Sequence, residues 1–156
     1  MPTSFQQTRL RKHADYGVVY GTSRKHQSPS LSYFYRAALM PVSDAPATSS
    51  RIGITVPKVL GAAPLRNRLK RRLRVAARVA LHHLPAGTDV VLHPRPVLAT
   101  MPFTILQQEI DSVFLAVARR IAQGAPNTPL PRQPRKGAKA GARSKPQPTS
   151  LNTAKP

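Results

Sequence analysis

The 156-residue sequence contains no cysteine and only five acidic residues, which stand against 25 lysines and arginines. Without thiols there is no disulfide, no thiolate ligand for zinc and no cysteine nucleophile. So few carboxylates disfavour paired acids for general acid–base catalysis and a protein-only cluster for magnesium. We therefore expect neither catalytic side chains nor a metal site made by the protein.

Long apolar runs are also missing. No stretch approaches the ~18 apolar residues of a membrane span, and the N-terminal segment lacks the apolar core of a signal peptide. We accordingly expect a cytoplasmic protein with no membrane partner. A basic helix lying on a membrane surface is disfavoured, because the apolar stripe of the basic segment is narrow and has no aromatic anchors.

The densest charge lies in residues 66–74 (RNRLKRRLR), where six of nine residues are cationic and none is acidic. If residues 64–83 form a helix, its apolar side chains make one narrow stripe and its cations cover most of the circumference. Like charges one turn apart repel each other, so such a helix is sustained when a polyanion meets its basic faces. The predicted stripe comprises Leu65, Leu69, Leu73, Ala76 and Ala80.

Solvated surface cations are the alternative interpretation of this segment. Surface helices normally mix both signs, yet no carboxylate occurs between Asp44 and Asp89. Asn67 is a poor helix former, so its place between two arginines is better explained by a contact than by propensity. These observations favour nucleic acid as the polyanion.

Helices and strands are predicted on both sides of the basic helix. The apolar run near residue 90 predicts a strand in the centre of a sheet, and Gly21 is a suitable stop for the first helix. The expected helices are 10–20 and 102–121, and the expected strands are 22–27, 31–40, 51–56 and 89–93. The predicted buried face of the last helix comprises Phe103, Leu106, Ile110, Val113, Phe114, Val117 and Ile121.

Aromatic residues gather in two places. Tyr16 and Tyr20 are one helical turn apart and therefore neighbours on the helix surface. The sequence leaves open whether both are core residues or form a stacking platform for unpaired bases. In the predicted strand 31–40, alternation puts Tyr33 and Tyr35 on one face and Phe34 on the other.

Composition divides the chain into three parts. Residues 1–8 are polar and expected to be loose, and residues 9–123 are expected to form one domain. Residues 124–156 contain seven lysines and arginines, no acid and almost no large apolar side chain. Such a segment cannot bury enough apolar area to order itself, so we expect a disordered basic tail that adds non-specific affinity for phosphates.

Five short stretches of the sequence, taken together, match the motifs of a known protein family. They are Asp15-Tyr16-x-x-x-Tyr20, Arg51-Ile-Gly-Ile-Thr-Val-x-Lys58, Gly61-x-Ala63, Arg66-Asn-Arg-Leu-Lys-Arg71 and Asp89-Val-Val-Leu-His-Pro-Arg-Pro96. In this order they resemble the protein subunit of bacterial ribonuclease P. The resemblance covers about residues 9–121 and is most specific over 51–74.

The resemblance implies an α/β (α+β) two-layer sandwich, like one domain of ribosomal protein S5, of order α-β-β-β-α-β-α. It implies a mixed four-stranded sheet and a left-handed βαβ crossover that carries the basic helix. In this family the RNA subunit is the catalyst and holds most of the Mg²⁺. The implied partners are therefore ribonuclease P RNA and precursor tRNA, without a small-molecule substrate, in a ribonucleoprotein endoribonuclease.

Carried over by position, two RNA sites fall on different elements. A cleft between the first helix and the sheet would grip the single-stranded 5′ leader of precursor tRNA. It would use Tyr16, Tyr20, Tyr33 and Tyr35, with Phe34 the alternative if the strand parity is shifted. The RNA subunit would be bound by Lys58, Arg66, Asn67, Arg68, Lys70, Arg71 and Arg74.

Three departures from the family pattern lie close to these sites. Pro57-Lys58-Val59 replaces the usual Ser-Lys-Lys and lacks one cation. Gly61-Ala-Ala-Pro64 replaces Gly-Asn-Ala-Val, so any contact made by that asparagine is absent. Pro94 replaces a small strand residue, which is expected to shorten the last strand or to place it at an edge.

Three other functions compete with this one. A ribosomal or other structural RNA-binding protein fits the composition, but it does not explain Tyr16 and Tyr20 beside the basic helix. A hydrolase that uses histidines is disfavoured, because the five histidines show no ligand or dyad spacing. A DNA-binding helix is weaker still, since the chain shows no dimerisation seam and no helix-turn-helix pattern.

Overall fold

The computed structural model describes residues 8–37 and 49–129. Within them, helices and strands follow in the predicted order α-β-β-β-α-β-α. The α-helices are α1 (His13–Thr22), α2 (Ala63–Ala80) and α3 (Phe103–Ala122). The strands are β1 (His26–Gln27), β2 (Leu31–Arg36), β3 (Arg51–Ile54) and β4 (Asp89–Pro94). Short 3₁₀ helices occur at η1 (Lys58–Leu60), η2 (Leu81–His83) and η3 (Pro96–Ala99).

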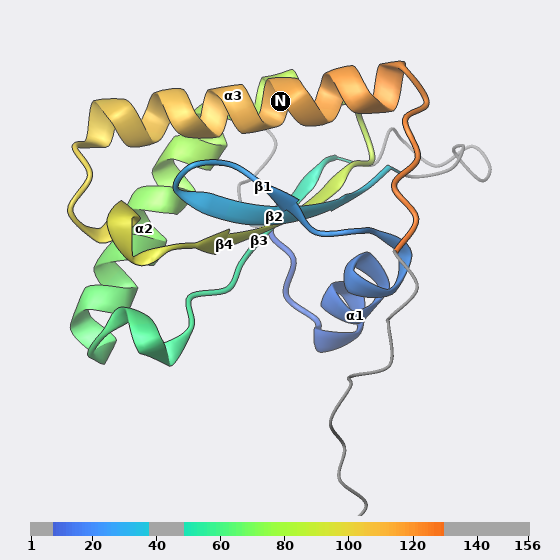
Figure 1. Ribbon diagram of the computed structural model, residues 1–156. Coiled ribbons are helices and arrows are strands. Elements are labelled where there is room, and N and C mark those ends of the chain that lie inside the picture. Colours follow the sequence, from blue (N-terminus) through green and yellow to red (C-terminus); the bar gives the residue numbers. More distant parts are fainter. Residues whose placement is uncertain (1–7, 38–48, 130–156) are drawn as a thin grey trace, which may run out of the picture.

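The strands form one mixed sheet in the order β1-β2-β4-β3. β2 pairs antiparallel with β1 and β4, whereas β3 lies parallel to β4, with Ile52 opposite Val90. The chain passes from β3 to its parallel neighbour β4 through α2 (Figure 1). The mixed four-stranded sheet and the α+β class are therefore confirmed, and β4 is central as predicted.

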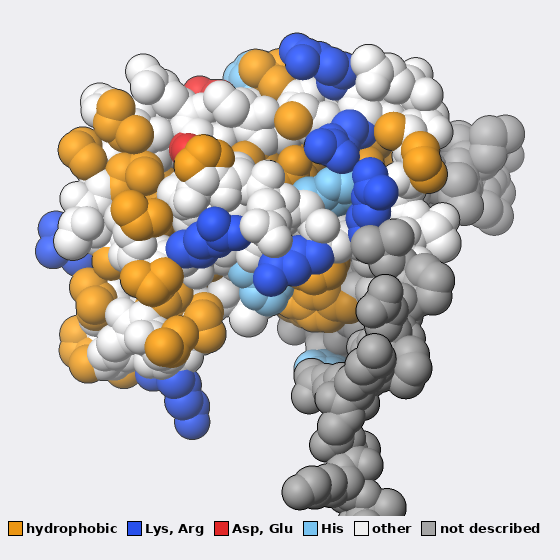
Figure 2. All heavy atoms as spheres, in the orientation of Figure 1, with side chains coloured by type: hydrophobic (Ala, Val, Ile, Leu, Met, Phe, Trp, Pro, Cys, Tyr) orange, Lys and Arg blue, Asp and Glu red, His pale blue; other side chains and the backbone are white. Residues whose placement is uncertain are grey.

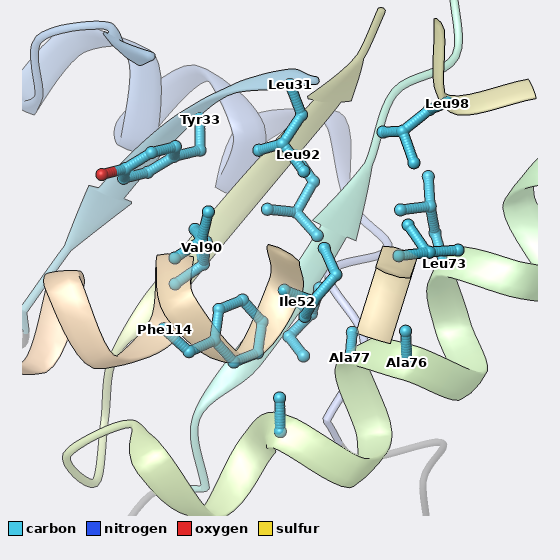
Figure 3. Close-up of a cluster of buried hydrophobic side chains, with 14 of the residues drawn as sticks. Leu31, Tyr33, Ile52, Leu73, Ala76, Ala77, Val90, Leu92, Leu98 and Phe114 are labelled. Carbon is cyan, nitrogen blue, oxygen red and sulfur yellow. The ribbon is translucent and has the colours of Figure 1, made fainter. Parts of the chain in front are cut away.

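One face of the sheet packs on α2 and α3 and holds the main core (Figure 3). Because alternate strand residues point to the same face, β2 and β4 each supply every second side chain to this core. The sheet residues of the core include Leu31, Tyr33, Tyr35, Ile52, Val90 and Leu92. The helix residues include Leu69, Leu73, Ala76, Ala77 and Ala80 of α2, and Leu106, Ile110, Val113, Phe114 and Val117 of α3.

The ends of the helices depart from the prediction. Leu65 and Phe103 were assigned to buried stripes but are 40% and 41% exposed. Both lie in the first turn of their helices, and the side chain of Leu65 lies over Gly61. The first helix does not end at Gly21 but includes Thr22, whose hydroxyl donates a 2.7 Å hydrogen bond to the carbonyl of Val18.

Pro94 neither shortens β4 nor places it at an edge, so that prediction is wrong. β4 lies between β2 and β3 and includes Pro94 as its last residue. The paired register of β3 and β4 ends where Ile54 faces Leu92, whereas Pro94 faces Leu31 of β2. The missing N–H is tolerated because it falls beyond the β3 ladder.

The opposite face of the sheet carries α1 over a much smaller apolar cluster. Leu10, Val19 and Val91 are its buried members, and aromatic side chains of α1 and β2 pack partly buried against them. A helix of 10 residues covers this face, whereas α2 and α3, of 18 and 20 residues, cover the other. The α1 side therefore leaves part of its aromatic surface open to solvent.

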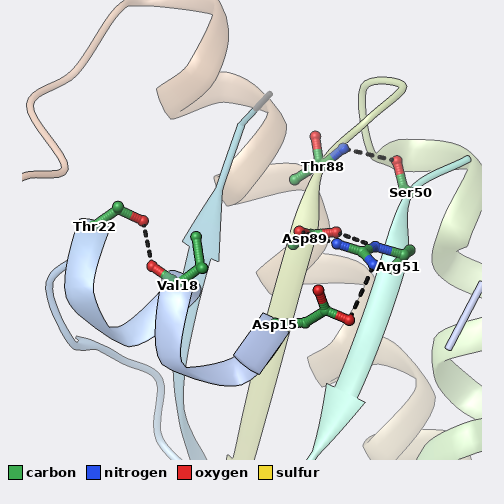
Figure 4. A network of polar contacts seen from close by, with 7 residues as sticks. All are labelled: Asp15, Val18, Thr22, Ser50, Arg51, Thr88 and Asp89. Carbon is green, nitrogen blue, oxygen red and sulfur yellow. Dashed lines mark hydrogen bonds and ion pairs between the residues drawn. The ribbon is translucent and has the colours of Figure 1, made fainter. Parts of the chain in front are cut away.

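An ion network fastens α1 to the sheet (Figure 4). Arg51 of β3 donates two hydrogen bonds of 2.8 Å to the carboxylate of Asp89 in β4. It also donates a 3.3 Å hydrogen bond to Asp15 of α1. The bond to Asp89 is the largest cause that raises the pKa of Arg51. Asp15 therefore holds the aromatic helix in a fixed orientation on the sheet.

Residues 124–129, which the composition assigns to the tail, contact the domain. The carbonyl of Asn127 accepts a 2.9 Å hydrogen bond from the amide of Arg24, and its side-chain amide donates to the carbonyl of Tyr35. Contacts with the domain thus extend beyond the predicted boundary at residue 123. Most of the predicted loose N-terminus (1–7) and the rest of the predicted tail (130–156) lie outside the described residues.

Candidate nucleic-acid interface

A groove of about 370 Å³ opens along α1. Tyr16 and Tyr20 of α1 and Thr55, just after β3, line it. Arg11 and His13 line it as well, at the N-terminal end of α1. Its volume falls within the roughly 300–1,000 Å³ of ligand pockets. Exposed ring surface next to a cation suits a nucleic-acid strand, whose bases stack and whose phosphates are anionic.

The rings of the groove belong to one aromatic cluster that spans α1, β2 and β4. The centroids of Tyr16 and Tyr20 lie 6.5 Å apart. Phe34 of β2 meets Tyr20 edge-on at a centroid distance of 4.9 Å, a favourable arrangement for two aromatic rings. The sequence left open whether the two tyrosines are core or platform; both are partly buried, which leaves part of each ring exposed.

His93 of β4 belongs to the same cluster, since its ring centroid lies 5.7 Å from that of Tyr20 and 5.6 Å from that of Phe34. Its Nε2 and the hydroxyl of Tyr20 share a hydrogen bond of 2.8 Å, and the same hydroxyl lies 3.5 Å from Oγ1 of Thr55. Burial first, and then the charge of Lys25, lowers the pKa of His93 below its ordinary value of 6.5. The sequence indicated a satisfied or surface histidine, and the hydrogen bond agrees. The contact between His93 and Tyr20 could not be predicted from local sequence patterns, because the two residues are 73 positions apart.

Gly53 of β3 lies directly beneath Tyr16. A Cβ atom at this position would lie 2.6 Å from Cε1 of the Tyr16 ring, closer than side chains tolerate. The ring therefore rests on bare backbone, and its hydroxyl donates a 3.3 Å hydrogen bond to the carbonyl of Leu10. Burial is the main cause that raises the pKa of Tyr16. Alternation predicted the face of Gly53 but not this contact.

Tyr33 and Tyr35 do not line the groove, which corrects the prediction that four tyrosines share one cleft. They are 3% and 2% exposed, on the face of the sheet that packs on α2 and α3. His26 of β1 lies beside them, with its ring centroid 5.4 Å from that of Tyr33 and 5.1 Å from that of Tyr35. Because successive strand residues alternate, Phe34, the alternative, is the β2 aromatic that faces α1.

The basic helix α2 presents its cations to the outside. The sequence-predicted residues Lys58, Asn67, Arg68 and Arg71 are exposed, and Arg66, Lys70 and Arg74 are half-buried. Among the described residues, none of the six cations in this set forms an ion pair with an acidic side chain. Described carboxylates therefore leave the charge of these six cations unneutralised, as an RNA-binding surface requires.

Arg72 is an exception within α2. Its guanidinium donates hydrogen bonds to the carbonyls of Leu98, Ala99 and Met101, which follow β4. The first two carbonyls belong to η3, and the third follows it. Arg72 therefore fastens α2 to the segment before α3, a role that the run of cations concealed.

The described carboxylates are engaged within the protein. Burial alone would raise the pKa of Glu109, but hydrogen bonds from Ser28 and Ser30 outweigh it and lower that pKa. Asp111 lies 3.7 Å from His83 and accepts a hydrogen bond from Gln107. In the view of Figure 2, acidic side chains appear only over α3, whereas basic ones are spread across the face. The protein thus presents a predominantly cationic surface.

Two other site classes find no support in residues 8–37 and 49–129. No group of three or more histidine and acidic side chains there is placed to hold a metal ion. The longest apolar helical stretches in the same residues fall short of a membrane span.

Comparison with known proteins identifies the family. The model of the ribonuclease P family matches residues 5–118. The ribonuclease P protein component of Paramagnetospirillum magneticum is 36% identical over 127 residues, which cover 79% of this chain and 94% of that protein. The component from Thermobifida fusca is 31% identical over 130 residues, 80% of this chain and 86% of that protein.

Solved structures agree with the fold. The ribonuclease P protein from Thermotoga maritima superposes with a TM-score of 0.59 at 26% identity, covering 69% of this chain and 96% of that one. The Staphylococcus aureus protein gives a TM-score of 0.57 at 24% identity, covering 72% and 95%. At that identity the second comparison supports the fold alone.

Proposed function

The chain belongs to the ribonuclease P protein family, a component of a tRNA-processing endoribonuclease, and we propose that it holds two RNAs together in that enzyme. The first is the catalytic RNA subunit, and the second is the 5′ leader of precursor tRNA, which the enzyme removes. The observation that carries this proposal is the pairing of an open aromatic groove with a basic helix whose exposed Arg68 and Arg71 form no ion pair with a described carboxylate. Both lie within the part of the chain that the family model matches.

The leader is assigned to the groove on α1. A single-stranded leader exposes its bases, and aromatic rings stack on bases of any sequence. Tyr16 and Tyr20 offer this surface, and Phe34 and His93 support Tyr20 from the sheet. Arg11 at the groove can neutralise a leader phosphate.

The RNA subunit is assigned to α2 and the turn before it. Lys58, Arg68 and Arg71 are exposed there, and Asn67 adds an amide that can donate to a phosphate or a base edge. Cations that neutralise phosphates also release bound counterions, which makes the affinity fall steeply with salt. We expect the complex to form in the cytoplasm.

The phosphodiester hydrolysis itself is assigned to the RNA subunit. Mg²⁺ prefers several free oxygen ligands, but the described carboxylates are committed to Arg51, to Ser28 and Ser30, and to His83 and Gln107. These side chains do not fit a protein-held magnesium site. We therefore assign the ion to RNA phosphates, and positioning and charge neutralisation to the protein.

Reconstitution tests the proposal. The protein is added to a bacterial ribonuclease P RNA at low magnesium, with precursor tRNA labelled at its 5′ end. We expect cleavage at the mature 5′ terminus with the wild type and its loss with the double variant Arg66→Ala/Arg68→Ala. The control is Arg119→Ala, which removes an exposed arginine from α3.

Two outcomes would contradict the proposal. Tight RNA binding without any rescue of cleavage would favour a structural RNA-binding protein. Cleavage by the protein alone, without an RNA subunit, would mean that protein side chains carry out the hydrolysis.

A further inference from the structure

A second concavity shares Tyr16 with the groove. It is lined by Arg9, Tyr16, Ile52, Ile54, Arg74 and Ala77. Its volume of about 20 Å³ has room for little more than one oxygen-sized group, because a single water needs roughly 10–15 Å³. Four parts of the chain therefore meet at this small pocket: the segment before α1, the helix α1, the strand β3 and the helix α2.

Backbone pairing fixes one wall of the pocket. Residue Arg9 forms a parallel bridge with Ile52 at the outer edge of β3. The amide of Leu10 donates to the carbonyl of Ile52, and the amide of Ile52 donates to the carbonyl of Thr8, at 3.0 and 2.7 Å. Arg9 is thus held beside the pocket by its main chain, while its side chain remains exposed.

Of the two arginines of the pocket, Arg74 is in an unfavourable environment in the free protein. Burial is the largest cause that lowers the pKa of Arg74, and the charges of Arg9 and Arg71 lower it further. The described ion pairs with carboxylates include neither Arg9 nor Arg74. The remaining carboxylate of the sequence, Asp44, lies outside the described residues. A bound anion would relieve this repulsion.

Structural arginines in this fold look different. Arg51 is neutralised by Asp89 and Asp15, and Arg72 donates to backbone carbonyls. Each of them joins two elements through hydrogen bonds made within the protein. Arg9 and Arg74 line a shared pocket with no such bond among the described contacts. Their positions are therefore better explained by ligand binding than by a contribution to the stability of the fold.

We propose that Arg9 and Arg74 form a seat for one backbone phosphate of RNA, and that the phosphate belongs to the precursor-tRNA leader. The assignment of this phosphate to the leader rests on the proposed function. The physical reason for the assignment is that Tyr16 lines both the pocket and the groove. A strand that stacks a base on Tyr16 in the groove carries its adjoining phosphate past the same ring. A phosphate oxygen then enters the pocket between the two guanidinium groups, which bind phosphate well.

The first experiment uses the protein alone. Thermal unfolding is followed with increasing inorganic phosphate for the wild type, Arg9→Gln, Arg74→Gln and the control Arg119→Gln. We expect phosphate to raise the Tm of the wild type and the control, and to raise it much less in the two pocket variants. Without phosphate, both pocket variants should be as stable as the wild type or more stable, because the repulsion between the two arginines is removed.

Two results would contradict the proposal that Arg9 and Arg74 bind a phosphate. Equal stabilisation by phosphate in all four proteins would show that phosphate binds elsewhere, as an adventitious ion only. A marked fall in Tm of the pocket variants without phosphate would show that the two arginines stabilise the fold. Arg74→Lys keeps the charge and should recover part of the phosphate effect.

The second experiment identifies the source of the phosphate. In the reconstituted enzyme, the affinities for precursors with a long leader and with a one-nucleotide leader are compared. Losing a charged hydrogen bond should weaken binding of the long-leader precursor by about tenfold in Arg9→Gln. Binding of the short-leader precursor and of the RNA subunit should be unchanged.

The outcomes of this second experiment separate the two hypotheses. Equal weakening for both leaders, together with weaker binding of the RNA subunit, would overturn the leader assignment in favour of an RNA-subunit phosphate. Failure of the wild type to support any cleavage would overturn the proposed function and with it the leader as the source. The phosphate titration would still decide whether the seat exists, since it needs no RNA.

Discussion

A pair of tyrosines lies on each side of the sheet, and the two pairs differ in how far they are buried. Tyr33 and Tyr35 lie under α3 and are almost completely buried. Tyr16 and Tyr20 lie on the α1 side and line an open groove. The residue type is the same, so the difference comes from the area of helix that covers each face. A face covered by one short helix keeps aromatic surface available for a ligand.

Each pair of tyrosines also has a histidine beside it, and the two histidines have different partners. His26, on the side of Tyr33 and Tyr35, accepts a 3.0 Å hydrogen bond from Arg120 at Nδ1 and pairs through Nε2 with Asn127. His93, on the α1 side, pairs with the Tyr20 hydroxyl instead. The first histidine joins parts of the fold, whereas the second positions a residue of the groove. The following changes test how far the faces differ.

The largest effect is expected in the core face. Phe114→Ala removes a fully buried ring that packs on the sheet (Figure 3). Such a truncation typically costs about 3–5 kcal/mol. Urea unfolding measures the loss, and Leu115→Ala, at a neighbouring residue that is 45% exposed, is the control with a change of about 0.5 kcal/mol or less. Similar losses in both variants would contradict the helix orientation.

A smaller effect on stability but a clear effect on binding is expected at Gly53. The Cβ of Gly53→Ala would collide with the Tyr16 ring, so the ring must move away from β3. Losing one base stack should weaken binding of the leader by about tenfold. Gly17→Ala is the control, since nothing lies within 4 Å of its new Cβ and a helical alanine is favoured over glycine. Unchanged leader affinity in Gly53→Ala would remove Tyr16 from the site.

Hydroxyl removal compares the two tyrosine pairs directly. Tyr20→Phe loses the hydrogen bond to His93 and should destabilise the protein by about 0.5–1.5 kcal/mol. The buried Tyr35 hydroxyl has no hydrogen-bond partner, so Tyr35→Phe should be neutral or slightly stabilising. Urea unfolding measures both, and leader affinity should change only in Tyr20→Phe. A change of leader affinity in Tyr35→Phe would restore Tyr35 to the interface.

The smallest effect is expected from pH. The pKa values of His26 and His93 lie below the ordinary 6.5 in the folded protein, mainly because of burial. The unfolded chain therefore takes up protons first as the pH falls, so the free energy of unfolding should be constant above about pH 7 and decrease below about 6.5. Urea unfolding between about pH 8 and 5 measures this. His93→Gln should flatten the decrease, and an unchanged slope would show that His93 does not contribute to it.

Local patterns in the sequence determined much of the fold and part of the site. Alternation in residues 31–36 separated Phe34 from Tyr33 and Tyr35, and the apolar stripe of residues 69–80 fixed which side of α2 is buried. The basic helix could be found because its charge pattern is local and extreme. The Arg-Asn-Arg stretch also carried the resemblance that named the family.

The tertiary structure decided what depends on contacts between distant parts of the chain. Which face of the sheet forms the groove follows from where α1 docks, and the ion network of Asp15, Arg51 and Asp89 sets that position. The same holds for the different roles of Arg72 and Arg74, two residues apart in one run of cations. Charge and periodicity are properties of neighbours in sequence, whereas burial and partners are set by packing between elements.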